Sequence, residues 1–276
     1  MVHSQAISKE ASLFVHKVVS FNTDYSEILA LMNKSWAAKP ALRALYHRWF
    51  KRIVRELSPA LPVIEIGSGC GNFKDFLPTA IATDVVRFNQ GVDCFADAQQ
   101  MPFGTGTVGT FVLVDCLHHL PRPLKFLKDA TRCLRPWGRI VLLEPAATPW
   151  ARLVWKLFHS EIVDLSADVF GEDSTAEPLN TDFMFANMGI ATLLFGHNLN
   201  RTMDSLGGLK LIKLEYSDFL VYPATGGYSG ASLIPRRLLR TLHALERFLT
   251  RPFDAWLTGM RMLIVLERTE TTLARV

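Results

Sequence analysis

Apolar residues in the first part of the chain recur at helical intervals. Between Glu27 and Leu57 they stand at Leu29, Met32 and Trp36, and again at Leu42, Leu45, Trp49 and Ile53. Spacings of three and four residues place such side chains on one face of a helix. Pro59 and Pro62 then interrupt the pattern, as expected where a helix has ended. We therefore predict helices that precede the main domain.

After Pro62 the pattern changes to short apolar runs that alternate with helical segments. The runs that predict strands are Val63–Ile66, Ala80–Asp84, the residues around Cys94, Thr110–Asp115 and Arg139–Glu144. A short helix is expected after the first run, and a longer one over Leu124–Leu134. Strands that alternate with helices are typical of a parallel sheet.

Beyond Glu144 the alternation is looser. We expect a helix over Trp150–Phe158, an apolar segment over Phe183–Phe195, strands over Leu209–Leu214 and Met262–Leu266, and a helix-rich insertion between these strands from Pro235. No internal repeat and no Gly-, Ser- or Pro-rich linker separates domains. We predict N-terminal helices over residues 1–62 and a core over residues 63–276, with lid insertions at about 146–208 and 217–260.

The composition is that of a folded chain with a substantial core. Of 276 residues, 49% are hydrophobic, and the mean hydropathy is +0.16, which excludes a disordered protein. No run reaches the roughly 18 apolar residues of a membrane-spanning helix, and the first residues lack a secretory pattern, so a cytoplasmic location is expected. The net charge of +4 does not by itself indicate nucleic acid. The four cysteines lack metal-ligand spacing, and we expect no metal.

A turn rich in glycine follows the first predicted strand. Its chemistry-bearing positions are Glu65, Gly67, Ser68, Gly69 and Gly71. Such a turn lets a ligand approach the backbone and presents N–H groups to an anionic group. Dinucleotides and S-adenosylmethionine are both bound this way. The dinucleotide pattern requires glycine at position 72, where the chain has Asn72, so the spacing favours S-adenosylmethionine.

Two further carboxylates stand at the ends of predicted strands. Asp84 ends the second strand, where its oxygens can accept hydrogen bonds from both ribose hydroxyls of an adenosine. Asp97 follows the third strand, where it could accept from the adenine amino group, and Met101–Phe103 would supply an apolar wall for the ring. These positions make an adenosine site the best interpretation of the turn.

The segments VIEIGSGCG, ATD, FADAQQMPF, FVLVDCLHHLPRP and LRPWGRIVLLEP, between Val63 and Pro145, together resemble the class I S-adenosylmethionine-dependent methyltransferases of the type 11 group. The resemblance implies a Rossmann-like α/β fold with a seven-stranded, mostly parallel sheet, its last strand antiparallel, and a helical lid. It also implies that the N-terminal helices cover the cofactor site. In its terms Gly67, Gly69 and Gly71 line the methionine end of the cofactor, Asp84 binds ribose, Asp97 and Ala98 bind adenine, and Asp115 and Cys116 lie beside the methionine moiety.

Three residues are candidates for proton transfer to or from an acceptor. His118 and His119 follow the fourth core strand at the edge of the sheet where ligands of open α/β folds gather. Glu144 ends the fifth strand over the same crevice, as a base or as a residue that orients one. The alternative is structural, because a histidine there can pack and a carboxylate can cap a turn.

The second half of the chain offers candidates for acceptor binding. His159 and Glu161 follow an apolar helix, where they could bind hydroxyl groups or simply cap and solvate the helix end. Tyr228, in a Gly-Gly-Tyr loop, is either a hydrogen-bonding lid residue or a packed aromatic. The basic amphipathic segment 235–256 either packs inward or makes a peripheral membrane contact.

The sequence therefore predicts transfer of a methyl group to a small or medium-sized, partly apolar acceptor, most often at oxygen. Nucleic-acid substrates are disfavoured because the position after the fourth core strand reads Asp115-Cys116-Leu117-His118 instead of a Pro-Pro-aromatic run. The alternatives left open are a catalytically inactive binding protein with this fold and a nicotinamide-dependent reductase. The sequence does not determine the attacked atom or the oligomeric state.

Overall fold

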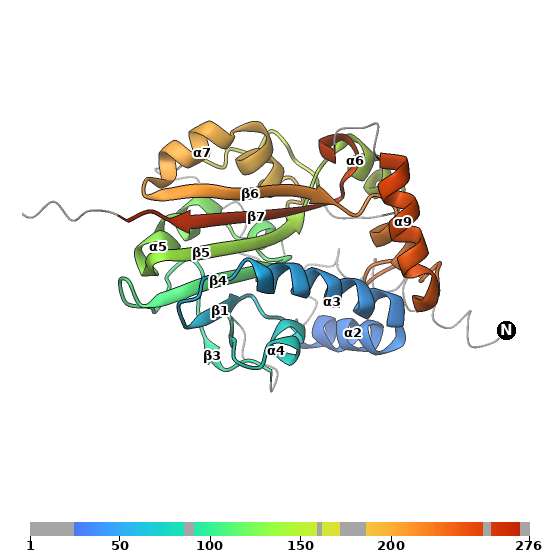
Figure 1. The fold of residues 1–276 in the computed structure, drawn as a ribbon, viewed down its shortest axis with the longest axis horizontal. Coiled ribbons are helices and arrows are strands. Elements are labelled where there is room, and N and C mark those ends of the chain that lie inside the picture. Colours follow the sequence, from blue (N-terminus) through green and yellow to red (C-terminus); the bar gives the residue numbers. More distant parts are fainter. Residues whose placement is uncertain (1–24, 86–90, 159–161, 172–185, 251–254, 271–276) are drawn as a thin grey trace, which may run out of the picture.

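One seven-stranded sheet runs through the molecule in the order β3-β2-β1-β4-β5-β7-β6 (Figure 1). The computed structural model describes residues 25–85, 91–158, 162–171, 186–250 and 255–270. The strands are β1 Val63–Ile66, β2 Ile81–Asp84, β3 Cys94–Phe95, β4 Val108–Val114, β5 Leu134–Pro145, β6 Leu209–Ser217 and β7 Arg261–Arg268. Each predicted strand is present, and β5 begins five residues earlier than the apolar run that predicted it.

Strands β1 to β5 pair in parallel, whereas β7 lies between β5 and β6 and is antiparallel to both. The predicted Rossmann-like sheet with an antiparallel last strand is therefore confirmed. Because β1, β2, β4 and β5 run in one direction, the residues that follow them meet at a single edge of the sheet. Asp84, Asp115 and Glu144 all stand at or just beyond this edge.

The helix α3, Pro40–Arg55, covers one face of the sheet, and α2, Tyr25–Ala38, precedes it. The apolar positions at helical spacing in α3 are all buried: Leu42, Leu45, Trp49 and Ile53. They pack against Val112, Val141 and Val265 from three adjacent strands. The N-terminal apolar pattern thus exists because α3 is a layer of the core.

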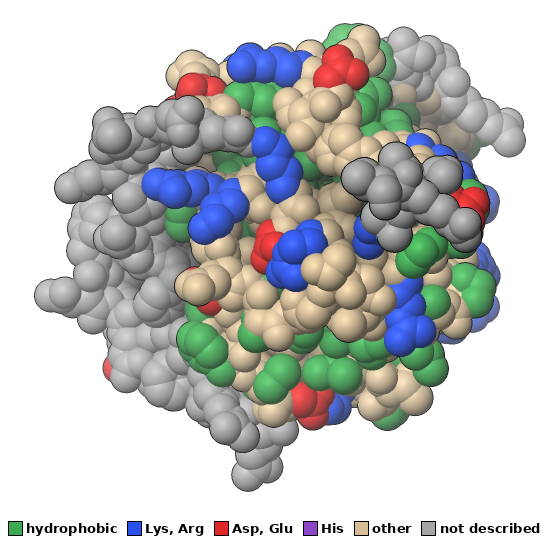
Figure 2. Space-filling model, turned by 90° about the vertical axis from the view of Figure 1, so that its left-hand side faces the viewer, with side chains coloured by type: hydrophobic (Ala, Val, Ile, Leu, Met, Phe, Trp, Pro, Cys, Tyr) green, Lys and Arg blue, Asp and Glu red, His purple; other side chains and the backbone are tan. Residues whose placement is uncertain are grey.

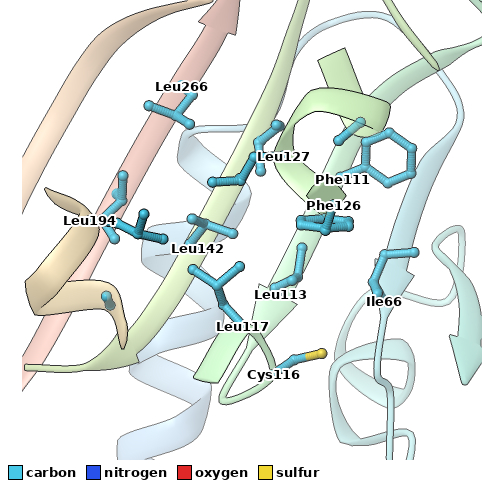
Figure 3. Packing of buried hydrophobic residues seen from close by; sticks show 14 of the residues in the cluster. Ile66, Phe111, Leu113, Cys116, Leu117, Phe126, Leu127, Leu142, Leu194 and Leu266 are labelled. Atoms are coloured by element: carbon cyan, nitrogen blue, oxygen red, sulfur yellow. The ribbon is translucent and has the colours of Figure 1, made fainter. Parts of the chain in front are cut away.

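The opposite face of the sheet carries α5, Pro123–Cys133, α7, Leu199–Leu206, and the π-helical segment η2, Thr192–His197. Figure 3 shows Phe126 and Leu127 of α5 and Leu194 of η2 against strand residues such as Leu142 and Leu266. Alternate residues of β4 and β5 serve the two faces, so the centre of each strand, residues 111–114 and 140–143, is an unbroken apolar run.

The remaining elements gather where the parallel strands end. They are α4 Asn72–Phe76, η1 Leu117–His119, α6 Pro149–Phe158, α8 Val221–Thr225, η3 Arg236–Leu238, α9 Leu239–Thr250 and α10 Ala255–Thr258. In Figure 1, α6 and α9 lie at this end, to the right. Within the first predicted lid insertion, residues 192–206 instead lie on the sheet as η2 and α7. The predicted boundaries at 62, 146–208 and 217–260 stay predictions.

Figure 2 shows the other end of the molecule, where Lys and Arg side chains lie scattered among polar and acidic ones. No described helix is both long enough and apolar enough to cross a bilayer.

Candidate functional site

A cavity of about 1260 Å³ opens at the edge where the parallel strands end. Its walls come from the glycine turn, the segment after β4, helices α2, α3 and α6, and residues 220–234. A pocket for one drug-sized ligand typically occupies ~300–1,000 Å³. This cavity therefore has room for two ligands side by side.

The glycine turn lies at one end of the cavity with its backbone in left-handed conformations. Gly67, Gly69 and Gly71 have φ angles of 67°, 50° and 75°, which favour glycine at all three positions. A Cβ on Gly67 would lie 2.3 Å from the Cys116 sulfur, so a side chain is also excluded sterically. A Cβ on Gly69 would meet nothing within 4 Å in the structure. The backbone at Gly69 is therefore open to a ligand.

The carboxylates of the turn differ in their surroundings. Asp84 accepts a hydrogen bond from the Gly69 N–H at 2.8 Å and thereby ties the end of β2 to the turn. Glu65 is buried, and its Oε2, like the Ser68 hydroxyl, has no hydrogen-bond partner among the described residues. Burial, with the nearby Asp84 charge, raises the pKa of Glu65 to about 8. Both unpartnered groups belong to cavity-lining residues.

Asp97 and Ala98, the predicted adenine-binding residues, also line the cavity. The Asp97 Oδ1 accepts the Gln99 N–H at 2.7 Å, which shapes the turn after β3. Gln99 was not singled out from the sequence, yet both polar atoms of its side chain are buried without a partner in the described structure. Nothing in the local pattern distinguishes it from the neighbouring Gln100.

The predicted apolar wall of Met101–Phe103 is wrong. Phe103 packs against Phe111 with ring centroids 5.7 Å apart, and Met101 is buried in the core cluster on the α5 face. The Met101 N–H donates to Asp129 of α5 at 3.3 Å, which holds the segment against that helix. These residues therefore face the core instead of the cavity.

Asp115 lines the cavity, and its carboxylate forms an ion pair with an arginine. Arg261, the first residue of β7, pairs with both carboxylate oxygens, and the Tyr46 hydroxyl donates to Oδ2 at 2.9 Å. The Arg261 guanidinium also stacks on Tyr222, 4.3 Å from its ring centroid. Although burial disfavours the charged guanidinium, the Asp115 carboxylate raises its pKa. Sequence reasoning did not identify Arg261, whose one signal is a charge at the start of an apolar strand.

Cys116, the next residue, is buried against the glycine turn. Burial, with the neighbouring Glu144 and Asp84 charges, raises the pKa of its thiol well above the ordinary value. Cys116 is therefore a neutral packing group beneath Gly67.

His118 and Glu144 form a buried pair at the centre of the site. The Glu144 Oε2 lies 2.6 Å from the His118 Nδ1, and its Oε1 accepts the N–H groups of Cys116 at 3.0 Å and Leu117 at 2.8 Å. Glu144 thus caps the η1 turn and orients an imidazole, which combines the two predicted alternatives. The ring of His119 lies against that of His118, with centroids 4.3 Å apart and planes tilted by 38°, and both histidines line the cavity.

Tyr228 lines the cavity next to the glycine turn. Its hydroxyl accepts a hydrogen bond from the Asn72 side chain at 3.1 Å, and its ring stacks on Trp36 of α2. The buried Lys39 ammonium donates to the carbonyls of Gly227 at 2.8 Å and Tyr228 at 3.0 Å. The loop is thus tied to the N-terminal helices. The predicted acceptor residues His159 and Glu161 lie outside the described residues.

A second polar cluster lies away from the cavity, between α3 and α9. Ligand atoms of Asp218, His243 and Glu246 lie within 4.8 Å of one another, which is close enough to hold a cation. However, Asp218 already accepts from the Trp49 indole at 2.9 Å. Glu246 likewise accepts from the N–H groups at the start of α8. Burial, together with the positive charge of Arg48, lowers the pKa of His243 to about 4. We interpret this cluster as a structural tie.

Comparison with known proteins gives a family for part of the chain. Residues 65–142 match the family described as a methyltransferase domain. No curated protein matches the chain.

Solved structures similar to this chain share little of its sequence. A SAM-dependent methyltransferase from Archaeoglobus fulgidus is 14% identical with a TM-score of 0.49, covering 82% of this chain and 94% of its own. A possible histamine N-methyltransferase from Thermotoga maritima is 16% identical with a TM-score of 0.48, covering 82% and 92%. Geranyl diphosphate C-methyltransferase from Streptomyces coelicolor, in complex with S-adenosyl-L-homocysteine, is 12% identical with a TM-score of 0.45, covering 82% and 77%.

The matched range spans the glycine turn, Asp84, Asp97 and the residues that follow β4, all of which line one cavity. The sheet that carries them has the predicted order and the antiparallel last strand. Residues 65–142 of the chain therefore carry a methyltransferase domain.

Proposed function

We propose that this enzyme transfers a methyl group to an oxygen atom of a small or medium-sized acceptor with apolar surface. The observation that carries the proposal is that one cavity joins the glycine turn, the buried His118–Glu144 pair and an apolar wall. S-adenosylmethionine supplies an activated methyl group on a sulfonium. The residues of this chain would bind the cofactor, orient the acceptor and remove its proton.

The residues present fit the cofactor. The unpartnered Glu65 carboxyl and Ser68 hydroxyl are the buried polar groups of the turn that a polar, cationic ligand would satisfy. Asp84 would accept from ribose hydroxyls while it holds the Gly69 N–H, and Asp97 with Ala98 and Gln99 would contact the adenine. The positive φ at Gly69 leaves the backbone accessible to the methionine end.

His118 is the proposed general base. With Nδ1 bonded to Glu144, the neutral imidazole carries its proton there, and Nε2 is the basic nitrogen. When bound, S-adenosylmethionine would supply the methyl group and leave as S-adenosylhomocysteine, and this Nε2 would take the proton of the acceptor oxygen. The buried carboxylate stabilises the imidazolium that results. A general base of this kind typically contributes about 10²–10⁴-fold in rate. His119, whose ring lies against that of His118, is the alternative base.

The acceptor side of the cavity is apolar. Trp150, Leu153, Leu157, Met188 and Leu233 line it. The acidic residues described in the lining, Glu65, Asp84, Asp97 and Asp115, belong to the parallel strands and the turns that follow them, and none belongs to the segments that carry this wall. Apolar surface in a pocket binds apolar ligand surface by removing both from water. An acceptor with a hydroxyl or carboxyl group on an apolar body fits this arrangement.

The test is a transfer assay with S-adenosylmethionine labelled on its methyl group and a panel of amphiphilic phenols, alcohols and carboxylic acids, matched with amines. We expect label in the organic extract from oxygen acceptors. In His118→Asn, turnover should fall about 10²–10⁴-fold, while the affinity for S-adenosylhomocysteine, measured by calorimetry, should stay within about twofold of wild type.

Transfer to amines alone would refute the assignment to oxygen. Binding of S-adenosylhomocysteine without transfer to any acceptor would favour the inactive binding protein. Binding of NADH in place of the homocysteine product would favour a reductase.

A further inference from the structure

We propose that the exposed faces of α6 and α9 form a docking surface for an anionic lipid membrane, with the mouth of the cavity against the bilayer. The surface consists of Arg152, Leu153, Lys156 and Leu157 on α6, the loop residue Leu233, and Leu238, Arg240, Leu245, Arg247, Phe248 and Leu249 on η3 and α9. Docking to lipid does not depend on the proposed methyl transfer, and it is tested separately.

The helix α9 has apolar residues on two sides, and only one of these sides is buried against the protein. Leu239 is buried together with His243 and Glu246, so this side faces the protein. Glu246 accepts hydrogen bonds from the N–H groups of Leu220 at 2.7 Å and Val221 at 2.9 Å, which holds the helix in this rotation. The amphipathic pattern of this segment predicted a helix with an apolar face, but only part of its apolar residues are buried in the structure.

The second stripe of α9 is exposed. Leu238, Leu245 and Leu249 follow one another at intervals of seven and four residues, and Phe248 adjoins them on the helix surface. Their exposed fractions are 46%, 47%, 41% and 67%. A row of large apolar side chains in solvent marks an interaction surface when neighbouring elements extend it.

Helix α6 lies at the same end of the molecule as α9 (Figure 1) and also has an exposed apolar face. Leu153 and Leu157, one helical turn apart, are 52% and 64% exposed. Arg152 and Lys156 stand beside them and are also exposed. Leu153, Leu157 and the loop residue Leu233, which is 76% exposed, also line the cavity. These three leucines therefore stand at its mouth, between the interior and the docking surface.

The charges on the two helices select the occupant. All exposed ionised side chains described on α6 and α9 are basic: Arg152 and Lys156 on α6, and Arg240 and Arg247 on α9. The lone acidic residue described on either helix, Glu246, is buried. The whole chain is far more balanced, with 30 basic and 26 acidic residues. Helices that carry exposed apolar side chains and whose exposed charges are all basic match a bilayer with anionic headgroups, into which the apolar side chains insert and with which the cations pair.

The experiment is vesicle co-sedimentation of the full chain. We expect binding to vesicles of equal parts phosphatidylcholine and phosphatidylglycerol, weaker binding to phosphatidylcholine alone, and a loss of binding as salt rises. The variant Leu245→Ser/Phe248→Ser should lower the partition coefficient at least about 10-fold, and Arg240→Glu/Arg247→Glu should lower it by a similar factor.

Matched controls change the same residue types elsewhere. Leu61→Ser/Trp137→Ser removes exposed apolar side chains that lie outside the surface, and Arg122→Glu/Lys125→Glu reverses two exposed charges by α5. Both controls should partition like wild type. All variants should retain wild-type affinity for S-adenosylhomocysteine, which shows that they are folded.

Two results would overturn the proposal. One is equal vesicle binding by wild type and both surface variants, or no binding by wild type. The other is a dimer in sedimentation velocity that Leu245→Ser/Phe248→Ser converts to monomer without any lipid binding by wild type, because the surface would then join two copies of the chain.

Discussion

Replacement of Glu144 by alanine tests the centre of the site. The wild-type carboxylate is fully buried and makes three interactions, with the N–H groups of Cys116 and Leu117 and with His118 Nδ1. Alanine leaves two buried N–H groups unpaired, and each such group costs about 1–3 kcal/mol. We expect Glu144→Ala to lower the free energy of unfolding by roughly 2–6 kcal/mol. The melting temperature should fall by about 4–12 °C.

Two companion variants separate capping from orientation. In Glu144→Gln the amide oxygen still accepts both N–H groups, so the free energy of unfolding should fall by only about 1–3 kcal/mol, from loss of the charge-assisted contact. His118→Asn leaves the cap intact and should cost less than Glu144→Ala. Both companions should still slow methyl transfer, because each removes the oriented base.

The assay is urea unfolding followed by the fluorescence of the tryptophans, with S-adenosylhomocysteine binding as a check on the folded state. The reasoning is refuted if Glu144→Ala and Glu144→Gln destabilise equally, since the two backbone N–H groups would then not depend on the carboxylate. It is refuted equally if His118→Asn costs as much as Glu144→Ala.

Three further predictions concern the cofactor end of the cavity. Burial raises the pKa of Glu65 in the folded, ligand-free protein to about 8, from 4.5 in an exposed carboxyl. Between these two pH values the folded protein holds a proton that the unfolded chain has released. The free energy of unfolding should therefore fall as the pH rises from about 4.5 to about 8. Calorimetry in two buffers should show proton release on S-adenosylmethionine binding near pH 7 for wild type and none for Glu65→Gln. Asp84→Ala should abolish S-adenosylhomocysteine binding in calorimetry, whereas His119→Ala should spare binding and slow turnover; unchanged turnover would remove His119 from the mechanism. Lys39→Met should remove the lysine's hydrogen bonds to the Gly227, Tyr228 and Gly230 carbonyls, of which Tyr228 keeps the Ser35 hydroxyl, and lower the free energy of unfolding by about 2–3 kcal/mol. Protease cleavage in the 226–230 loop is the readout, and resistance equal to wild type would show that Lys39 does not hold the loop.

Features encoded by neighbouring residues could be predicted from the sequence. The turn at Gly67 to Gly71 needs left-handed backbone at three glycines, a local property that its spacing reveals. The carboxylates at strand ends were predictable because parallel strands bring their ends to one edge. His118 and Glu144 were each placed at that edge, but their 2.6 Å contact depends on how η1 settles against β5.

Features made by distant residues could not be predicted in this way. Arg261 and Asp115 are 146 positions apart, and Lys39 reaches carbonyls 188 and 189 positions away. The wrong assignment of Met101–Phe103 has the same origin, because a contact with Asp129 on another helix turns the segment into the core. No local pattern carries such contacts.

The sequence by itself determined the strands and helices of the core and the glycine turn with its carboxylates, whereas the antiparallel last strand was implied by the family resemblance. The elements and the turn follow from hydrophobic period and glycine conformation, which act over a few residues. Only the tertiary structure decided that Asp115 is paired with Arg261, that Glu144 both caps a turn and orients His118, and which apolar stripe of α9 faces solvent. Each of these depends on contacts between elements that are far apart in the sequence. Such contacts, and the burial of the side chains that make them, exist only when the whole chain has folded.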